Sequence, residues 1–295
     1  MSYALGNHEP LRSGLRRIVH EEADGALSAL IAARRSPAEA DEGIHDARKC
    51  FKKIRAVLRL VRHRLPGETY HGENRTWRDA ARMLSGVRQS TALAGTIGSL
   101  GPTVGHRLPS ASLEAFAARL QRRHRDLLEG ALRDGGAVER SASMARRAGD
   151  RIDLWLEAGS GGFDTVGDGL RKVYERGRTR MADAYAEPTG PRFHEFRKRA
   201  KYLEYQMRIL APTWERPSEP WAESQHDLTS LLGEGNDLTD LITLLGEEPD
   251  LLPGPHAPDI LRRFCDRRRC ELWEAARPLA VRLYAEAPDR FVERM

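Results

Sequence analysis

Apolar residues recur at steps of three and four along most of the chain, the spacing that places side chains on one face of an α-helix. The first such run puts Leu11, Leu15 and Ile18 on one stripe. The pattern predicts helices at about 11–36, 37–65, 70–97, 110–133 and 137–157, then at 164–186, 191–210, 217–245 and 258–285. Proline or glycine separates most of these runs, and we expect the glycine-containing loop 98–102 to close the third helix.

Apart from the run at 137–157, the predicted helices fall into two groups of four on either side of a glycine cluster, Gly159-Ser160-Gly161-Gly162. Because the other loops are short, neighbouring helices should run antiparallel and each group should form a four-helix bundle. We therefore predict an all-α fold in one domain over 8–287. It would comprise a first bundle at 8–136, a connecting helix and joint at 137–162, and a second bundle at 163–287.

The composition agrees with helices and places the chain in the cell. Charged residues make up 31% of the chain and aromatic residues 6%, which is typical of long amphipathic helices. The three cysteines (Cys50, Cys265 and Cys270) form no CxxC pair, so we expect no disulfide framework. No stretch reaches the roughly 18 apolar residues of a membrane span, and the first residues lack a secretory signal. We expect a soluble protein of the cytoplasm.

The two halves share sequence. His45-Asp46-Ala47-Arg48-Lys49 parallels His194-Glu195-Phe196-Arg197-Lys198, 149 positions later. Leu15-Arg16-Arg17-Ile18-Val19 likewise parallels Leu170-Arg171-Lys172-Val173-Tyr174, and Met83-Leu84-Ser85-Gly86 parallels Leu231-Leu232-Gly233-Glu234. A repeat of this length predicts a duplicated bundle whose copies pack about a pseudo-two-fold axis.

The first repeated histidine begins a row of basic side chains. His45, Arg48, Lys49, Lys52, Arg55 and Arg59 stand at steps 0, 3, 4, 7, 10 and 14, which form one stripe on a helix. Like charges at this spacing destabilise an isolated helix by roughly 0.2–0.5 kcal/mol per pair. The stripe therefore indicates an anionic ligand that neutralises it.

The second copy repeats the arrangement with less charge. His194, Arg197, Lys198, Lys201, Tyr205 and Arg208 stand at steps 0, 3, 4, 7, 11 and 14. Glu204 interrupts this row, so we expect the His45 helix to contribute more than the His194 helix. Arginine offers planar paired donors that match phosphate oxygens, and lysine adds a movable point charge, so the rows favour a phosphate-rich polyanion.

Other interpretations of these rows stay open. A charge run is often only a solvated helix face, although its repetition with the same spacing argues against that here. Each histidine could donate to phosphate in its protonated form, or could simply cap or pack at the start of its helix. A metal is not expected, because no cysteine, aspartate or second histidine stands at ligand spacing beside either one.

Further basic residues on neighbouring helices could line the same anion-binding site, or could simply be exposed on the surface. They are Arg16, Arg82 and Arg88 in the first half, and Arg171 and Arg178 in the second.

The pattern His-x-x-Arg-Lys-x-x-Lys on a long helix, present at both His45 and His194, resembles the CHAD family, the conserved histidine α-helical domain. The resemblance covers about 11–285. It implies two pseudo-symmetric four-helix bundles with a basic cavity between them, and binding of inorganic polyphosphate. The ligand residues that it implies are His45, Arg48, Lys49, Lys52, Lys53, Arg55, His194, Arg197, Lys198 and Lys201.

The chain departs from the family pattern at two places. A basic residue usually stands where this chain has Glu204. The family's Leu-Gly-x-x-Arg-Asp turn reads Leu84-Ser85-Gly86-Val87-Arg88-Gln89 in the first half and Leu232-Gly233-Glu234-Gly235-Asn236-Asp237 in the second. Both departures put the second half's share of binding in doubt.

These observations predict a non-enzymatic module that binds inorganic polyphosphate without a cofactor, in the cytoplasm or on polyphosphate granules. Enzymes of polyphosphate metabolism are further candidate partners, and no membrane partner is expected. The first alternative is a nucleic-acid-binding helical surface, although we find no helix-turn-helix register and no stacking aromatic residues. The second is a phosphohydrolase that uses His45 or His194, although no carboxylate cluster for Mg²⁺ stands near either motif.

Overall fold

The computed structural model describes residues 3–105, 107–157, 164–213 and 218–295. These parts of the chain are almost wholly helical and contain no strand, which confirms the all-α prediction. The first half contains α1 (Leu11–Arg35), α2 (Ala40–Leu60), α3 (Gly67–Met83), α4 (Ser85–Val104), α5 (Ser110–Leu132), α6 (Ala137–Gly149) and α7 (Ile152–Glu157). The second contains α8 (Asp164–Ala186), α9 (Gly190–Leu210), α10 (Ser218–Glu247), α11 (Ala257–Leu283) and α12 (Pro288–Glu293).

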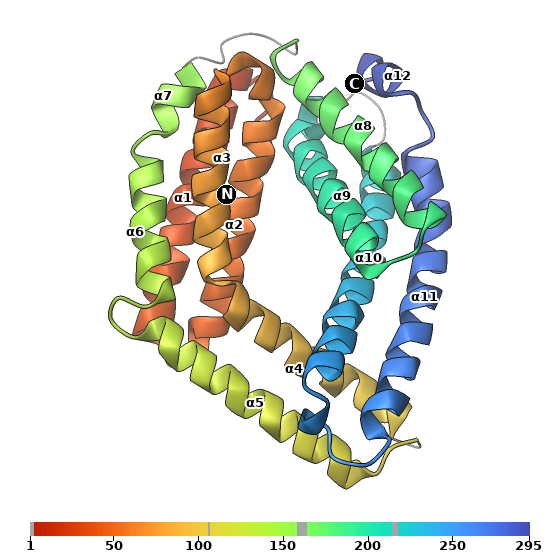
Figure 1. Cartoon of the computed structure of the whole chain (residues 1–295). Coiled ribbons are helices and arrows are strands. Elements are labelled where there is room, and N and C mark those ends of the chain that lie inside the picture. The colour runs from red at the N-terminus through yellow and green to blue at the C-terminus, as the bar shows by residue number, and fades with distance from the viewer. Residues whose placement is uncertain (1–2, 106, 158–163, 214–217) are drawn as a thin grey trace.

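Two groups of helices lie side by side (Figure 1). In the first, α1 packs against α2 and α6, and α3 packs against α2 and α6. In the second, α9 packs against α8 and α10, and α10 packs along α11. The groups meet where α2 contacts α8 and α9, so the two histidine helices lie next to each other at the centre of the molecule.

Helices α4 and α5 form an arm that leaves the first group and reaches the second (Figure 1). They pack against each other, and α4 also contacts α10. Leu93, Ile97 and Phe116 of the arm belong to a separate apolar core with Leu241 of α10 and Leu261 of α11. This arm ties the two halves together at the end opposite α7 and α12.

The arm differs from the sequence prediction in two ways. The helix expected over 70–97 is broken at the fully buried Leu84, and the expected loop 98–102 is helical, as part of α4. The reason is tertiary packing: the buried side chains of Leu93, Ile97 and Val104 hold α4 against its partners despite its glycines.

The segment expected to connect the halves also lies elsewhere than predicted. Within 137–157, α6 packs against α1 and α3 and so completes the first group. It is α4 and α5, not α6, that reach across to the other half. The glycine cluster 159–162 lies outside the described residues, so its role as a joint stays a prediction.

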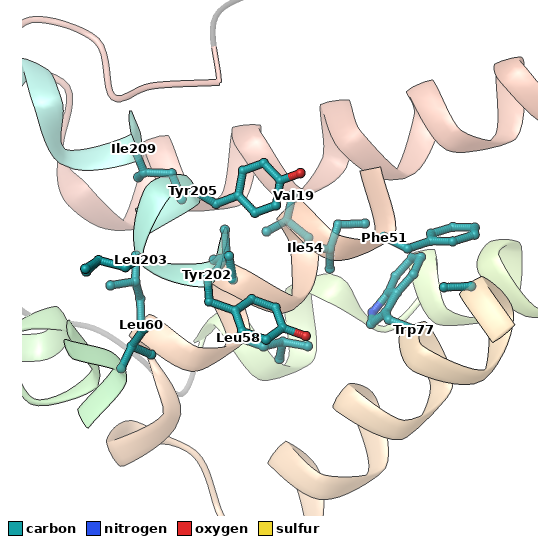
Figure 2. Packing of buried hydrophobic residues seen from close by; sticks show 14 of the residues in the cluster. Val19, Phe51, Ile54, Leu58, Leu60, Trp77, Tyr202, Leu203, Tyr205 and Ile209 are labelled. Atoms are coloured by element: carbon teal, nitrogen blue, oxygen red, sulfur yellow. The ribbon is translucent and has the colours of Figure 1, made fainter. Parts of the chain in front are cut away.

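The seam between α2 and α9 is tightly packed (Figure 2). Ile54 and Leu58 of α2 lie with Leu203 and Ile209 of α9 in one apolar cluster. The buried side-chain amide of Gln206 donates to the carbonyl of Ala56 at 3.1 Å, which fixes the position of one helix against the other. The C-terminal half of α9 is buried on nearly all sides, because it packs between α2 and α10.

None of the helices in the described parts of the chain is both long and apolar enough to cross a bilayer.

Candidate functional site

A cavity of about 940 Å³ lies between the halves, bounded by α2, α4, α9 and α10. Its basic lining residues are His45, Arg88, Arg197 and Lys201, and its acidic ones are Asp41, Glu42, Glu234 and Asp237. Hydroxyl groups come from Thr91, Thr96, Ser99, Thr229 and Ser230. The wall thus combines charges of both signs with many hydrogen-bond donors.

Lys52 lies at the electrostatic centre of the basic residues. Burial, together with the positive charges of Arg48, Arg197, Arg88 and Lys201, lowers the pKa of its ammonium group to about 7. These four residues come from α2, α9, α4 and α9, so cations of both halves converge on Lys52. No carboxylate among the described residues lies within ion-pair distance of the Lys52 ammonium group.

Arg48 and Arg197, the two arginines of the repeated motif, keep unused donors. The Nε atom of each is buried and has no hydrogen-bond partner in the described residues. Arg48 also donates from Nη1 to the carbonyl oxygen of Ala81 near the end of α3, and burial lowers its pKa to about 10. A buried donor without a partner costs about 1–3 kcal/mol, and an anion in the cavity would remove that cost.

The two histidines make matching contacts. Arg88 donates from Nε to Nδ1 of His45 at 3.0 Å, and Nδ1 of His194 contacts Oδ1 of Asn236. Arg88 and Asn236 occupy the same position in the two Leu-Gly segments, so this pairing repeats in both halves. The expected turn is present only in the first half, at Leu84, because the second segment lies within the continuous helix α10.

Burial and the charge of Arg88 lower the pKa of His45. Since Nδ1 accepts the bond from Arg88, the neutral ring carries its proton on Nε2. In the free protein the neutral His45 ring therefore donates from Nε2, and its protonation by a bound phosphate stays a prediction.

The carboxylates of the wall are partly compensated by their neighbours. Asp41 accepts from Thr91 Oγ1 at 2.9 Å and faces His124 Nε2 at 2.9 Å. Burial raises the pKa of Asp237. Glu204, a buried residue beside the cavity, contacts Lys201 at 2.8 Å and accepts from Thr229 at 2.8 Å. Glu204 thus forms an ion pair with Lys201, and the weaker contribution of the second row to binding stays a prediction.

Several predicted residues lie away from the cavity. Lys53 forms an ion pair with Glu22 at 2.5 Å, and Lys49 lines a different hollow beside Glu22. Tyr205 is buried against Tyr3, with ring centroids 6.0 Å apart. The contacts made by Lys53 and Tyr205 join the N-terminal segment and α1 to the seam, which helical spacing alone does not reveal.

The C-terminal part of the first row turns to another set of neighbours. The Arg59 guanidinium lies 3.8 Å from the ring centroid of Tyr202, and Arg55 donates to Asn74 at 3.1 Å. On α9, Lys198 forms an ion pair with Glu195.

The remaining candidates also lie off the cavity wall. Arg16 forms a bidentate pair with Asp153 at 2.7 Å. Arg171 lies 3.7 Å from Asp289, and Arg208 borders an outer hollow. Arg82 and Arg178 are exposed.

Sequence reasoning missed the contribution of α10 and of the hydroxyl groups. Thr229, Ser230 and Asp237 carry no basic signal, and only the folded arrangement brings α10 against α4. The repeated Leu-Gly segment was the one available indication, because its two copies contain Arg88 and Asn236.

Comparison with known proteins identifies the fold. A family model, the CHAD domain, matches residues 21–246, which is more than half of the chain. The crystal structure of the CHAD domain from the plant Ricinus communis superposes with a TM-score of 0.69 at 15% identity, covering 95% of this chain and 94% of that one. PptA from Streptomyces chartreusis superposes with a TM-score of 0.61 at 14% identity, covering 94% and 100%. No curated protein sequence matches the chain. The chain therefore belongs to the CHAD domain family.

Proposed function

We propose that this chain binds inorganic polyphosphate, without catalysis, in the cavity between its two halves. The observation that carries the proposal is the convergence of Arg48, Arg88 and Arg197 on Lys52, with no carboxylate in ion-pair contact with Lys52 in the described residues. A group of cations that repel one another is stabilised by an anion placed between them. The unused Nε donors of Arg48 and Arg197 supply direct hydrogen bonds to such an anion.

The chemistry of the wall favours a phosphate chain without bases. The hydroxyl groups of Thr96 and Ser99 donate to the carbonyl oxygens of Ala92 and Gly95 in the free protein, and each would rotate to donate to a phosphate oxygen. No phenylalanine, tyrosine or tryptophan lines this cavity within the described residues, whereas single-stranded nucleic acid is usually held by stacking on such rings. Polyphosphate satisfies the positive groups and needs no stacking surface.

Replacing both motif arginines, Arg48→Ala with Arg197→Ala, is expected to weaken binding of long-chain polyphosphate by roughly 30-fold. The loss follows from removing two charge-assisted donors that have no other partner at Nε. Isothermal titration calorimetry at fixed salt measures it. Salt must be held constant because polyanion binding releases counterions.

The matched control removes the same charge elsewhere: Arg82→Ala with Arg178→Ala, both exposed and off the cavity wall. This control should stay within about threefold of the wild type. Equal affinity of all three proteins would mean that Arg48 and Arg197 do not bind polyphosphate. Competition by duplex DNA at equal phosphate concentration would favour nucleic acid instead, and release of phosphate with Mg²⁺ would mean catalysis.

Polyphosphate binding should take up a proton above neutral pH. The pKa of Lys52 is about 7 in the free protein, and a bound polyanion raises it, so at higher pH the ammonium group must form on binding. Affinity should therefore fall as pH rises above 7, by at most about tenfold per pH unit for one proton, and level off below 7. Calorimetry at pH 8 in two buffers of different ionisation enthalpy measures the uptake directly.

Lys52→Met should abolish most of that proton uptake, because methionine keeps an unbranched side chain as far as Cε but has no group that titrates. An unchanged proton uptake in Lys52→Met would assign the effect to another group, such as His45.

A further inference from the structure

A second basic hollow lies at the other end of α2, away from the cavity. It is formed where α2 and the turn after it meet α8 and α9, and its charged lining residues are Arg59, Arg62, Lys172, Arg176 and Arg199. Its enclosed space is about 10 Å³, which admits one water-sized group. A single anion oxygen fits inside, with the rest of the ion at the mouth.

The hollow is positively charged because its cations are only partly paired. Lys172 contacts Glu175 at 2.7 Å, and Arg199 contacts Glu195 at 3.5 Å. Within the described residues no carboxylate lies within ion-pair distance of Arg59, Arg62 or Arg176. Arg59 belongs to α2, Arg62 to the short helical turn after it, and Arg176 to α8. The Nε atom of Arg199 is also buried without a hydrogen-bond partner.

Tyr202 lines this hollow, and the pKa of its hydroxyl group depends on the charges around it. Its side chain is buried, the Arg59 guanidinium lies 3.8 Å from its ring centroid, and its hydroxyl makes no hydrogen bond within the described residues. Burial alone would raise the pKa of Tyr202, yet the charges of Arg59, Arg55 and Arg199 leave it below the ordinary value. The surroundings therefore stabilise a negative charge.

The close approach of two helices holds the hollow together. Gly169 of α8 lies against the backbone of α2, and a Cβ atom there would overlap the carbonyl oxygens of Arg59 and Leu60. Lys172 and Arg176 follow Gly169 by three and seven residues, so they lie on the same face of α8 and beside Arg59. The cations are thus positioned by backbone contact before any ligand arrives.

We propose that this hollow is a second anion site that takes one compact phosphate group, between Arg59, Arg62, Arg176 and the Tyr202 hydroxyl. The site lies outside the cavity and does not depend on the proposed function of that cavity. The phosphate group could be free orthophosphate or one unit of a longer chain, and these two sources are distinguished by the test.

The test uses the phenol of Tyr202 as the readout. The difference in tyrosinate absorbance between the wild type and Tyr202→Phe is titrated with pH, without ligand, with orthophosphate and with long-chain polyphosphate. A phosphate bound at the hollow adds negative charge, so the pKa of Tyr202 should rise. A rise with orthophosphate identifies free phosphate as the ligand, and a rise with polyphosphate alone identifies a chain unit.

Two variants separate the hollow from the cavity. In the variant Arg62→Gln with Arg176→Gln, the phosphate concentration that gives half of the maximal shift in the Tyr202 pKa should be about tenfold higher. Arg48→Ala with Arg197→Ala should leave the response to orthophosphate unchanged, even if it abolishes binding in the cavity. No shift of Tyr202 with either ligand, or an equal response of the Arg62/Arg176 variant and the wild type, would overturn the proposal.

Discussion

Replacing Lys52 with glutamate is expected to abolish tight polyphosphate binding while making the free protein more stable. In the wild type, Lys52 is repelled by Arg48, Arg88, Arg197 and Lys201. A glutamate would be attracted by the same four groups, so the free energy of unfolding should rise by on the order of 1 kcal/mol. The same carboxylate would occupy the place of the anion and repel it, and affinity should fall by roughly 100-fold or more.

Calorimetry and chemical denaturation of the same samples measure the two effects. Lys49→Glu is the matched control, because Lys49 is exposed on the same helix and lies outside the cavity. It should change neither quantity by much more than an exposed charge normally does, about 0–1 kcal/mol. A Lys52→Glu protein that is less stable than the wild type would contradict the unbalanced positive charge at the seam.

Replacing Gly169 with alanine is expected to lower the free energy of unfolding by about 3 kcal/mol or more. The added Cβ would overlap the backbone carbonyl oxygens of Arg59 and Leu60, and backbone atoms cannot rotate aside as a side chain can. Helix α8 would have to move away from α2 and open the packing between the halves. Urea denaturation followed by circular dichroism measures the change.

Gly72→Ala is the control for the helix propensity of alanine. Gly72 is an exposed residue inside α3, and a Cβ there would meet nothing within 4 Å. This variant should be more stable than the wild type by up to about 1 kcal/mol, because alanine favours a helix over glycine. Equal effects of both substitutions would mean that α8 does not pack on α2 at this position.

The helical class and the repeated histidine motif could be predicted from the sequence, because both depend on local spacing. The apolar stripe of α1 and the parallel between His45 and His194 are visible within a few turns of helix. The prediction that the basic row forms one continuous binding surface does not match the arrangement of its side chains. Helix α2 is surrounded by other helices, so neighbouring members of its row meet different partners: Lys52 is buried among the cations of both halves, Lys53 pairs with Glu22, and Arg59 lies against Tyr202.

What the sequence did not reveal depends on contacts between distant segments. Tyr205 has the spacing of a ligand residue, but Tyr3 covers it from the far N-terminal end of the described chain. The hydroxyls of Thr229 and Ser230 reach the cavity only because α10 packs against the arm. No local pattern encodes such an arrangement, since side-chain spacing describes one helix and not its neighbours.

The arm formed by α4 and α5 has a consequence for the order in which the protein is made. Its apolar residues, among them Ile97 and Phe116, are covered by Leu241 and Leu261, which are synthesised much later. A ribosome therefore releases the arm well before its cover exists, and such exposed apolar surface favours aggregation during synthesis. Protection of this two-helix arm by chaperones would therefore matter until α10 and α11 have been made.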